Sequence, residues 1–170
     1  MGDLTRNFST WEFEASQIAA RKGWDNKIPE ELTPNVRMLA DKGQQIRNCL
    51  NREFGCDLGG AEISVNLSSG FRGSRLNRYL GSKPTSAHRQ ALGMDFGASR
   101  MSPREVFNAI RNSRELMRGV DQIILEHEEW CHLGMRLKNP RGEVLIASLE
   151  KRFIGKPKTV YQRVGHGPIF

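Results

Sequence analysis

The sequence has 170 residues, of which 38% are hydrophobic and 26% are charged, and it carries a formal net charge of +7 with an isoelectric point near 9.7. These proportions are typical of one globular domain, and no apolar run approaches the roughly 20 residues that a membrane-spanning helix needs. The positive charge favours binding to polyanions. The basic residues are scattered, however, and match no common nucleic-acid-binding motif, so we expect no specific nucleic-acid partner.

The first residues, MGDLTRNFSTWEFEAS, lack the basic start and apolar core of a secretory signal peptide. We therefore expect the protein to be cytoplasmic when it is synthesised. Its three cysteines, Cys49, Cys56 and Cys131, are odd in number and show no CxxC spacing. This predicts free thiols, with neither a disulfide framework nor an all-cysteine zinc site.

Two helices are predicted in the first third of the chain. Ser9 followed by Glu12 is a capping-box arrangement, which predicts the start of a short helix. Thr33 and Pro34 indicate a second helix start, and Gly55 indicates its end. Between them, apolar residues recur with a helical period at Val36, Leu39, Ile46, Cys49, Leu50 and Phe54. We expect this helix to place one face against a core.

The period changes after residue 60. Ile63, Val65 and Leu67 alternate with polar neighbours, as in a half-buried strand. A loop with at most one helical turn is predicted to follow. Further strands are predicted at 92–97, 121–127, 130–137 and 142–148. The signals Ser102, Pro103, Glu105 and Gly119 predict a helix between the first two of these strands.

This order of elements predicts a single α+β domain with helices packed on a small, mostly antiparallel sheet. We assign residues 1–150 to that domain and residues 151–170 to a basic C-terminal tail, for which no period predicts regular structure. We expect the protein to be a monomer.

The chain has four histidines, His88, His127, His132 and His166. A catalytic zinc ion is usually held by three His, Asp or Glu ligands, which leave one position for water. His88 and Asp95 lie seven positions apart and would approach each other across a turn, so a third ligand is needed from His127 or His132. His132 is flanked by small or apolar residues, as a ligand held in a rigid sheet would be. A hydrogen-bonded His-Asp pair without a metal is the alternative.

Several motifs resemble one family in order and approximate spacing: SSGFR, LNRYLGSKPTSAH, GMDF, DQIILE and WCHLG. The resemblance is to the zinc D-alanyl-D-alanine carboxypeptidases and dipeptidases. That family includes the L-alanyl-D-glutamate endopeptidases of phage endolysins and shares its fold with the hedgehog signalling domain. The resemblance extends to about residue 137, and the N-terminal LTRNFSTWEF is similar to the phage-type branch.

The resemblance implies a role for five residues. His88, Asp95 and His132 match the zinc ligands in the pattern S-x-H-x(6)-D followed by W-x-H. Arg72 matches an arginine that faces the substrate and the developing negative charge. Ser86 matches a serine that helps to hold the substrate or a ligand by hydrogen bonding.

Two positions depart from the family, which usually has glycine where Ala91 stands and alanine where Gly93 stands. Both exchange small residues, so we expect them to affect geometry more than chemistry.

Two glutamates are candidates for the general base. Glu129 lies three residues before His132, as the acid does in the carboxypeptidase and dipeptidase branches, and Glu126 lies six residues before it, as in the phage-type branch. An even offset along a strand places Glu126 on the side of His132, whereas Glu129 needs a turn or bulge to reach the metal. The resemblance narrowly favours Glu129 and keeps Glu126 as the second candidate. Either glutamate would otherwise be a solvated carboxylate.

The resemblance implies hydrolysis of peptidoglycan stem peptides, as a D-Ala-D-Ala carboxypeptidase or an L-Ala-D-Glu-type endopeptidase. A phage endolysin that reaches the wall through a separate membrane pore fits the missing signal peptide, as do a virion component and a cytoplasmic dipeptidase. Two other classes stay open: a catalytically inactive, zinc-containing cell-wall-binding module, and a basic nucleic-acid-binding protein with an incidental His-Asp pair.

Overall fold

The computed structural model describes residues 2–150 and 157–166. The helices are α1 (Thr10–Glu14), α2 (Gln17–Arg21), α3 (Thr33–Phe54), α4 (Ser74–Tyr79), α5 (Pro103–Asn112) and α6 (Arg114–Met117), with 3-10 turns η1 (Glu30–Leu32) and η2 (Ala87–Gln90). The strands are β1 (Val65–Ser69), β2 (Gly93–Ala98), β3 (Val120–Glu126), β4 (Trp130–Met135), β5 (Glu143–Glu150) and β6 (Lys158–His166).

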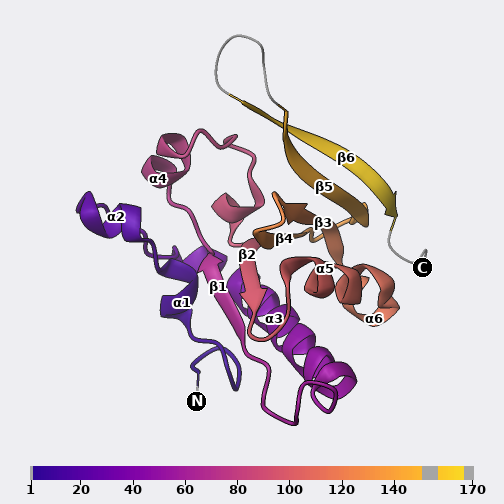
Figure 1. Cartoon of the computed structure of the whole chain (residues 1–170). Coiled ribbons are helices and arrows are strands. Elements are labelled where there is room, and N and C mark those ends of the chain that lie inside the picture. The colour runs from indigo at the N-terminus through magenta and orange to yellow at the C-terminus, as the bar shows by residue number, and fades with distance from the viewer. Residues whose placement is uncertain (1, 151–156, 167–170) are drawn as a thin grey trace.

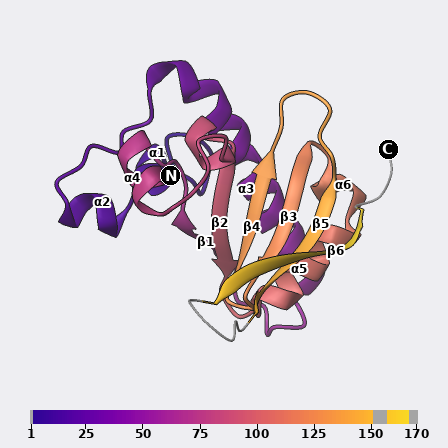
Figure 2. The same ribbon diagram turned by 90° about the horizontal axis from the view of Figure 1, so that it is seen from above.

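The strands form one sheet in the order β1-β2-β4-β3-β5-β6, which α3, α5 and α6 cover on one face (Figures 1 and 2). Neighbouring strands are antiparallel except β3 and β5, which are parallel because the chain leaves β4 and crosses β3 before it forms β5. The predicted α+β class with a mostly antiparallel sheet is confirmed. Within the described residues, no helix combines the length and the apolar character that a bilayer crossing needs.

The long helix α3 is found where its apolar period predicts it, although Thr33 is its first residue rather than its N-cap. The predicted helix after residue 101 is divided in two at Ser113. The capping box of Ser102 and Glu105 starts α5, and the Ser113 side chain then accepts a hydrogen bond from the Leu116 amide and starts α6. The division is caused by the capping of α6 by Ser113, which the apolar period alone does not reveal.

Strand β6 lies in the segment for which the sequence predicts no regular structure. It pairs with β5 from Lys158 opposite Glu150 to His166 opposite Glu143. All its side chains that the structure describes are exposed or half-buried. Because neither face of β6 is buried, its sequence lacks the alternation that reveals a strand. Residues 151–156 and 167–170 of the predicted tail lie outside the described residues.

The two faces of the sheet have different roles. Phe96, Cys131 and Leu125 lie opposite one another on β2, β4 and β3, and all three are fully buried in the core. The next row of the same strands contains Asp95 and His132, whose side chains project to the other face because successive residues of a strand alternate. The polar residues of interest therefore lie on the face opposite α3 and α5.

Candidate metal centre

Three side chains on this face converge on one point. His88 Nε2 lies 3.2 Å from His132 Nδ1 and 3.2 Å from Asp95 Oδ1, and His132 Nδ1 lies 2.7 Å from Asp95 Oδ1. In a tetrahedral zinc site with bonds of about 2.0–2.1 Å, neighbouring ligand atoms are roughly 3.3 Å apart. The triangle therefore has the size of one face of such a site. The structure thus brings together the three residues expected to hold zinc.

The ligand atoms come from elements distant in sequence. Asp95 and His132 lie directly opposite each other on β2 and β4, and His88 lies on η2. His88 Nδ1 donates a hydrogen bond to the Gly70 carbonyl oxygen at 2.6 Å. Because a carbonyl oxygen only accepts, this bond places the proton on Nδ1 and leaves the lone pair of Nε2 facing the other two side chains. The orientation is the one that a metal ligand needs.

The surroundings of His88 and Asp95 favour the protonation states in which these residues bind a metal. Burial lowers the pKa of His88, which keeps its imidazole neutral. Burial alone would raise the pKa of Asp95, but the hydrogen bond with His132 outweighs that effect and holds the pKa well below its usual range. A neutral histidine and an ionised aspartate are the forms that bind zinc.

Arg72 binds the Asp95 carboxylate through Oδ2, whereas the two histidines approach Oδ1. Its Nη2 donates to the second carboxylate oxygen, Oδ2, and its Nε donates to Ser69 Oγ at 3.0 Å. Its backbone amide also donates to the His88 carbonyl oxygen at 3.1 Å. Arg72 therefore fixes the orientation of Asp95, a contact that the sequence does not reveal, since the resemblance implies that this arginine faces the substrate.

Ser86 is half-buried and immediately precedes η2. Its carbonyl oxygen accepts a hydrogen bond from the Arg89 amide, and its own amide donates to the Lys83 carbonyl oxygen. No side-chain hydrogen bond of Ser86 is found among the residues that the structure describes. Its expected contact with substrate stays a prediction.

The two candidate glutamates differ in their placement. Glu126 ends β3 two residues after Ile124, which lies opposite His132, so Glu126 projects to the same face as the three candidate ligands. Its side chain is 14% exposed, and burial raises its pKa, with the charges of His132 and Asp95 also acting on it. Glu129 is exposed, in the turn between β3 and β4. The placement favours Glu126 as the base.

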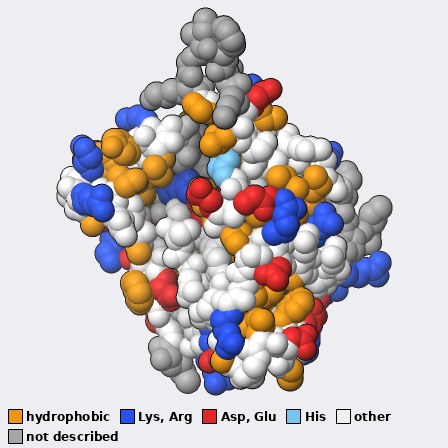
Figure 3. Space-filling model, viewed as in Figure 1, with side chains coloured by type: hydrophobic (Ala, Val, Ile, Leu, Met, Phe, Trp, Pro, Cys, Tyr) orange, Lys and Arg blue, Asp and Glu red, His pale blue; other side chains and the backbone are white. Residues whose placement is uncertain are grey.

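The turn that separates these glutamates is unusual. His127 and Glu128 have φ values of 53° and 62°, in the left-handed region that L-residues rarely adopt. His127 packs edge-on against Trp130 and is not part of the convergent group, which excludes it as the third ligand in this arrangement. The space-filling view shows a histidine side chain at the surface with carboxylates beside it (Figure 3).

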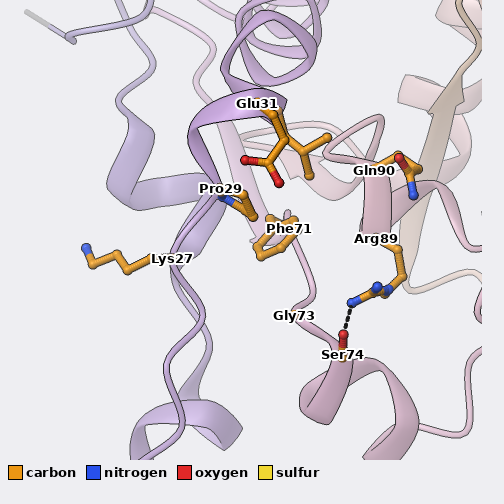
Figure 4. A pocket seen from close by; sticks show the side chains of 9 residues that line it. Lys27, Pro29, Glu31, Phe71, Gly73, Ser74, Arg89 and Gln90 are labelled. Carbon is orange, nitrogen blue, oxygen red and sulfur yellow. Dashed lines mark hydrogen bonds between the residues drawn. The ribbon is translucent and has the colours of Figure 1, made fainter.

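A pocket of about 440 Å³ is lined in part by the sequence neighbours of Arg72 and His88. Phe71 and Gly73, which flank Arg72, line it together with Arg89, which follows His88 (Figure 4). Lys27, Pro29 and Glu31 are among the remaining lining residues, and Figure 4 shows Pro29 beside Phe71, across from Arg89. None of the expected site residues lines this pocket, so it is separate from the centre formed by His88, Asp95 and His132.

The two departures at Ala91 and Gly93 determine how the chain passes from η2 into β2. Ala91 has a φ of 52°, a left-handed conformation that costs an L-residue about 1–2 kcal/mol and that glycine adopts freely. At Gly93 the backbone is crowded: a β-carbon there would lie 2.9 Å from the His88 nitrogen. In this chain, glycine is therefore required at 93 for the close approach of η2.

We expect Gly93→Ala to lower the free energy of unfolding by about 1–3 kcal/mol, because the added methyl group must push η2 away from β2. Denaturant unfolding of the metal-free protein measures this change. Gly97→Ala is the matched control, since a β-carbon at Gly97 in the same strand meets nothing within 4 Å. Equal stability of the two variants would contradict the close approach at Gly93.

Comparison with known proteins bears on these residues. A family model described as peptidase M15 matches residues 6–134. No curated protein matches the chain. The matched region contains every residue expected at the site, from Arg72 to His132, and stops before β5 and β6. Because the match covers well over half of the chain, it confirms the resemblance seen in the sequence. The chain belongs to the peptidase M15 family, the zinc D-Ala-D-Ala carboxypeptidase type of metallopeptidase.

Proposed function

We propose that this protein is an active zinc peptidase that hydrolyses peptidoglycan stem peptides, with His88, Asp95 and His132 as its metal ligands. The observation that carries the proposal is the triangle of ligand atoms, 2.7–3.2 Å on a side, on the face of the sheet opposite α3 and α5. Membership of the peptidase M15 family supports the same chemistry. We further propose the cellular role of a phage endolysin, in keeping with the phage-type N-terminal sequence.

In this proposal the catalytic roles fall to side chains around the three ligands. Zinc, when bound, lowers the pKa of water toward about 7 and polarises the peptide carbonyl. Glu126 takes a proton from the attacking water and passes it to the nitrogen of the leaving amine, a role that its raised pKa suits. Peptide bond cleavage then yields a carboxylate and a free amine.

Arg72 and Ser86 hold the reacting groups in place. Arg72 keeps Asp95 oriented through Oδ2, and among the described residues its Nη1 has no partner, so it can donate to the substrate. Its positive charge lies beside the position where negative charge develops in the transition state. Ser86 offers the substrate a half-buried hydroxyl group.

The test is to measure zinc and peptide products together. We expect purified protein to contain about one zinc ion per chain and to release peptide fragments from chemically defined peptidoglycan, identified by mass spectrometry. Loss of a terminal D-Ala assigns a carboxypeptidase, and a new D-Glu amino terminus assigns an endopeptidase. Retained zinc with unchanged peptidoglycan would instead indicate a binding module, and protein without zinc would contradict the proposed site.

A further inference from the structure

The hairpin of β5 and β6 extends the sheet beside the strand that ends in Glu126. It lies beyond residue 134, where the family match ends, and no site residue was expected in it. Both strands join the same sheet that carries Asp95 and His132, and β5 pairs directly with β3, which ends in Glu126 (Figure 1). The hairpin therefore continues the sheet next to Glu126, on the side away from β4.

One row of the sheet connects the hairpin to the candidate base. Trp130, Glu126, Ala147 and Tyr161 lie opposite one another on β4, β3, β5 and β6. Residues opposite each other on paired strands project to the same face, so all four side chains lie on the face of the three candidate ligands. Tyr161 is thus placed on this face by the register of the sheet.

Ala147 lies between Tyr161 and Glu126 in this row and carries the smallest side chain of the four. Neighbouring strands are roughly 4.8 Å apart, so the backbone of Tyr161 is about 10 Å from that of Glu126. The single methyl group of Ala147 is buried between them, and a tyrosine side chain extends well beyond it. The hydroxyl group can therefore approach the site from the side of β6.

The electrostatic environment of Tyr161 agrees with this placement. Burial raises the pKa of its hydroxyl group, and the negative charges of Glu126 and Asp95 raise it further. The hydroxyl therefore stays protonated at neutral pH and is available as a hydrogen-bond donor. The residue as a whole is still 54% exposed, so its ring also offers a free apolar surface.

One ion pair links β6 to β5 near Tyr161. Arg163, two residues after Tyr161 and on the same face, pairs with the buried carboxylate of Glu143 on β5. Arg141 binds the same carboxylate at 2.9 Å. Because Glu143 anchors β6 close to Tyr161, the tyrosine is carried by a fixed strand rather than by a loop.

We propose that Tyr161 is a substrate-contacting residue, whose hydroxyl group donates a hydrogen bond to the carbonyl oxygen of the scissile peptide bond while its ring packs on the adjacent stem-peptide residue. The inference rests on the proposed function, since it concerns the same substrate. No proton is transferred: the hydroxyl group stabilises the negative charge that develops on the carbonyl oxygen.

Kinetics with a matched pair of variants tests the hydrogen bond. The chain has two tyrosines, Tyr79 and Tyr161, and both are largely exposed. We expect Tyr161→Phe to lower kcat on a synthetic stem pentapeptide by roughly ten- to a hundredfold, since a hydrogen bond to a charged group is lost. KM, zinc content and thermal stability should stay close to those of the wild type. Tyr79→Phe should keep wild-type kinetics. Wild-type kcat in Tyr161→Phe would overturn the proposal.

Tyrosine-labelled protein gives a readout that does not depend on hydrolysis. With two tyrosines, ring NMR signals are assigned by comparison with Tyr79→Phe. Adding the stem pentapeptide to zinc-loaded Glu126→Gln protein should shift the Tyr161 signal and leave that of Tyr79 in place. A peptide that is hydrolysed by the wild type without a Tyr161 shift in this variant would overturn the contact alone. Absence of both hydrolysis and shift would overturn the proposed function together with it.

Discussion

His88→Ala should purify without stoichiometric zinc and should not hydrolyse peptidoglycan. The substitution removes one of three ligand atoms and leaves Asp95 and His132, which cannot fill a three-ligand zinc site. Loss of a single supporting hydrogen bond already weakens metal binding roughly 10–100-fold, so loss of a ligand should exceed that. Zinc content by elemental analysis and fragment release from peptidoglycan measure the two effects.

Gln90→Ala is the matched control, because Gln90 is an exposed residue of the same 3-10 turn. It should keep both zinc and activity. Circular dichroism of both variants in a chelator separates loss of metal from loss of fold. Stoichiometric zinc and full hydrolysis in His88→Ala would contradict the proposed ligand set.

Glu126→Gln should lower kcat by roughly 10²–10⁴-fold, the usual contribution of a general base, without loss of zinc. Glu126 faces the ligands from the end of β3 with its side chain 14% exposed, whereas Glu129 lies in the exposed turn. Glu129→Gln is therefore the matched control and should change kcat little. The reverse result would assign the base to Glu129, which the family resemblance narrowly favours.

The free energy of unfolding, measured as a function of pH, tests whether Glu126 has a structural role. Because burial raises the folded-state pKa of Glu126, the folded protein binds more protons than the unfolded chain between the two pKa values. The contribution of Glu126 to the free energy of unfolding therefore falls as pH rises through that range. Metal-free Glu126→Gln should lack this decrease and be at least as stable as the wild type at neutral pH. A less stable variant would indicate a structural role for the carboxylate.

Sequence periods predicted the layers of the fold well. The apolar repeat of α3 and the alternation in β1 reflect burial of one side of each element, and burial selects apolar residues directly. They did not predict β6, whose described side chains are exposed or half-buried, because a strand without a buried face leaves no such pattern. Nor did they predict the end of α5, which depends on the hydrogen bond at Ser113.

For the candidate site, the sequence indicated the residues that converge but not the contacts that orient them. His88, Asp95 and His132 have side chains whose chemistry is visible in the sequence, and the structure brings them together. The Gly70 carbonyl oxygen that orients His88 has no sequence signal, since every residue carries one. The contact of Arg72 with Asp95 and the position of Tyr161 both follow from three-dimensional arrangement, between segments far apart in the chain.

The parallel pairing of β5 with β3 covers an edge of the sheet that the residues matched by the family model would leave open. A chain shortened to the matched region would leave β3, with Ile123, Ile124 and Leu125 buried in the intact protein, as an unpaired edge. Such an apolar edge is a template for pairing with other chains. In the intact sheet β6 forms the edge on this side, and its Lys158, Gln162 and Arg163 present charged and polar side chains instead. Fusion partners should therefore be attached after β6. Both strands of the hairpin are then kept, and the apolar edge of β3 stays paired.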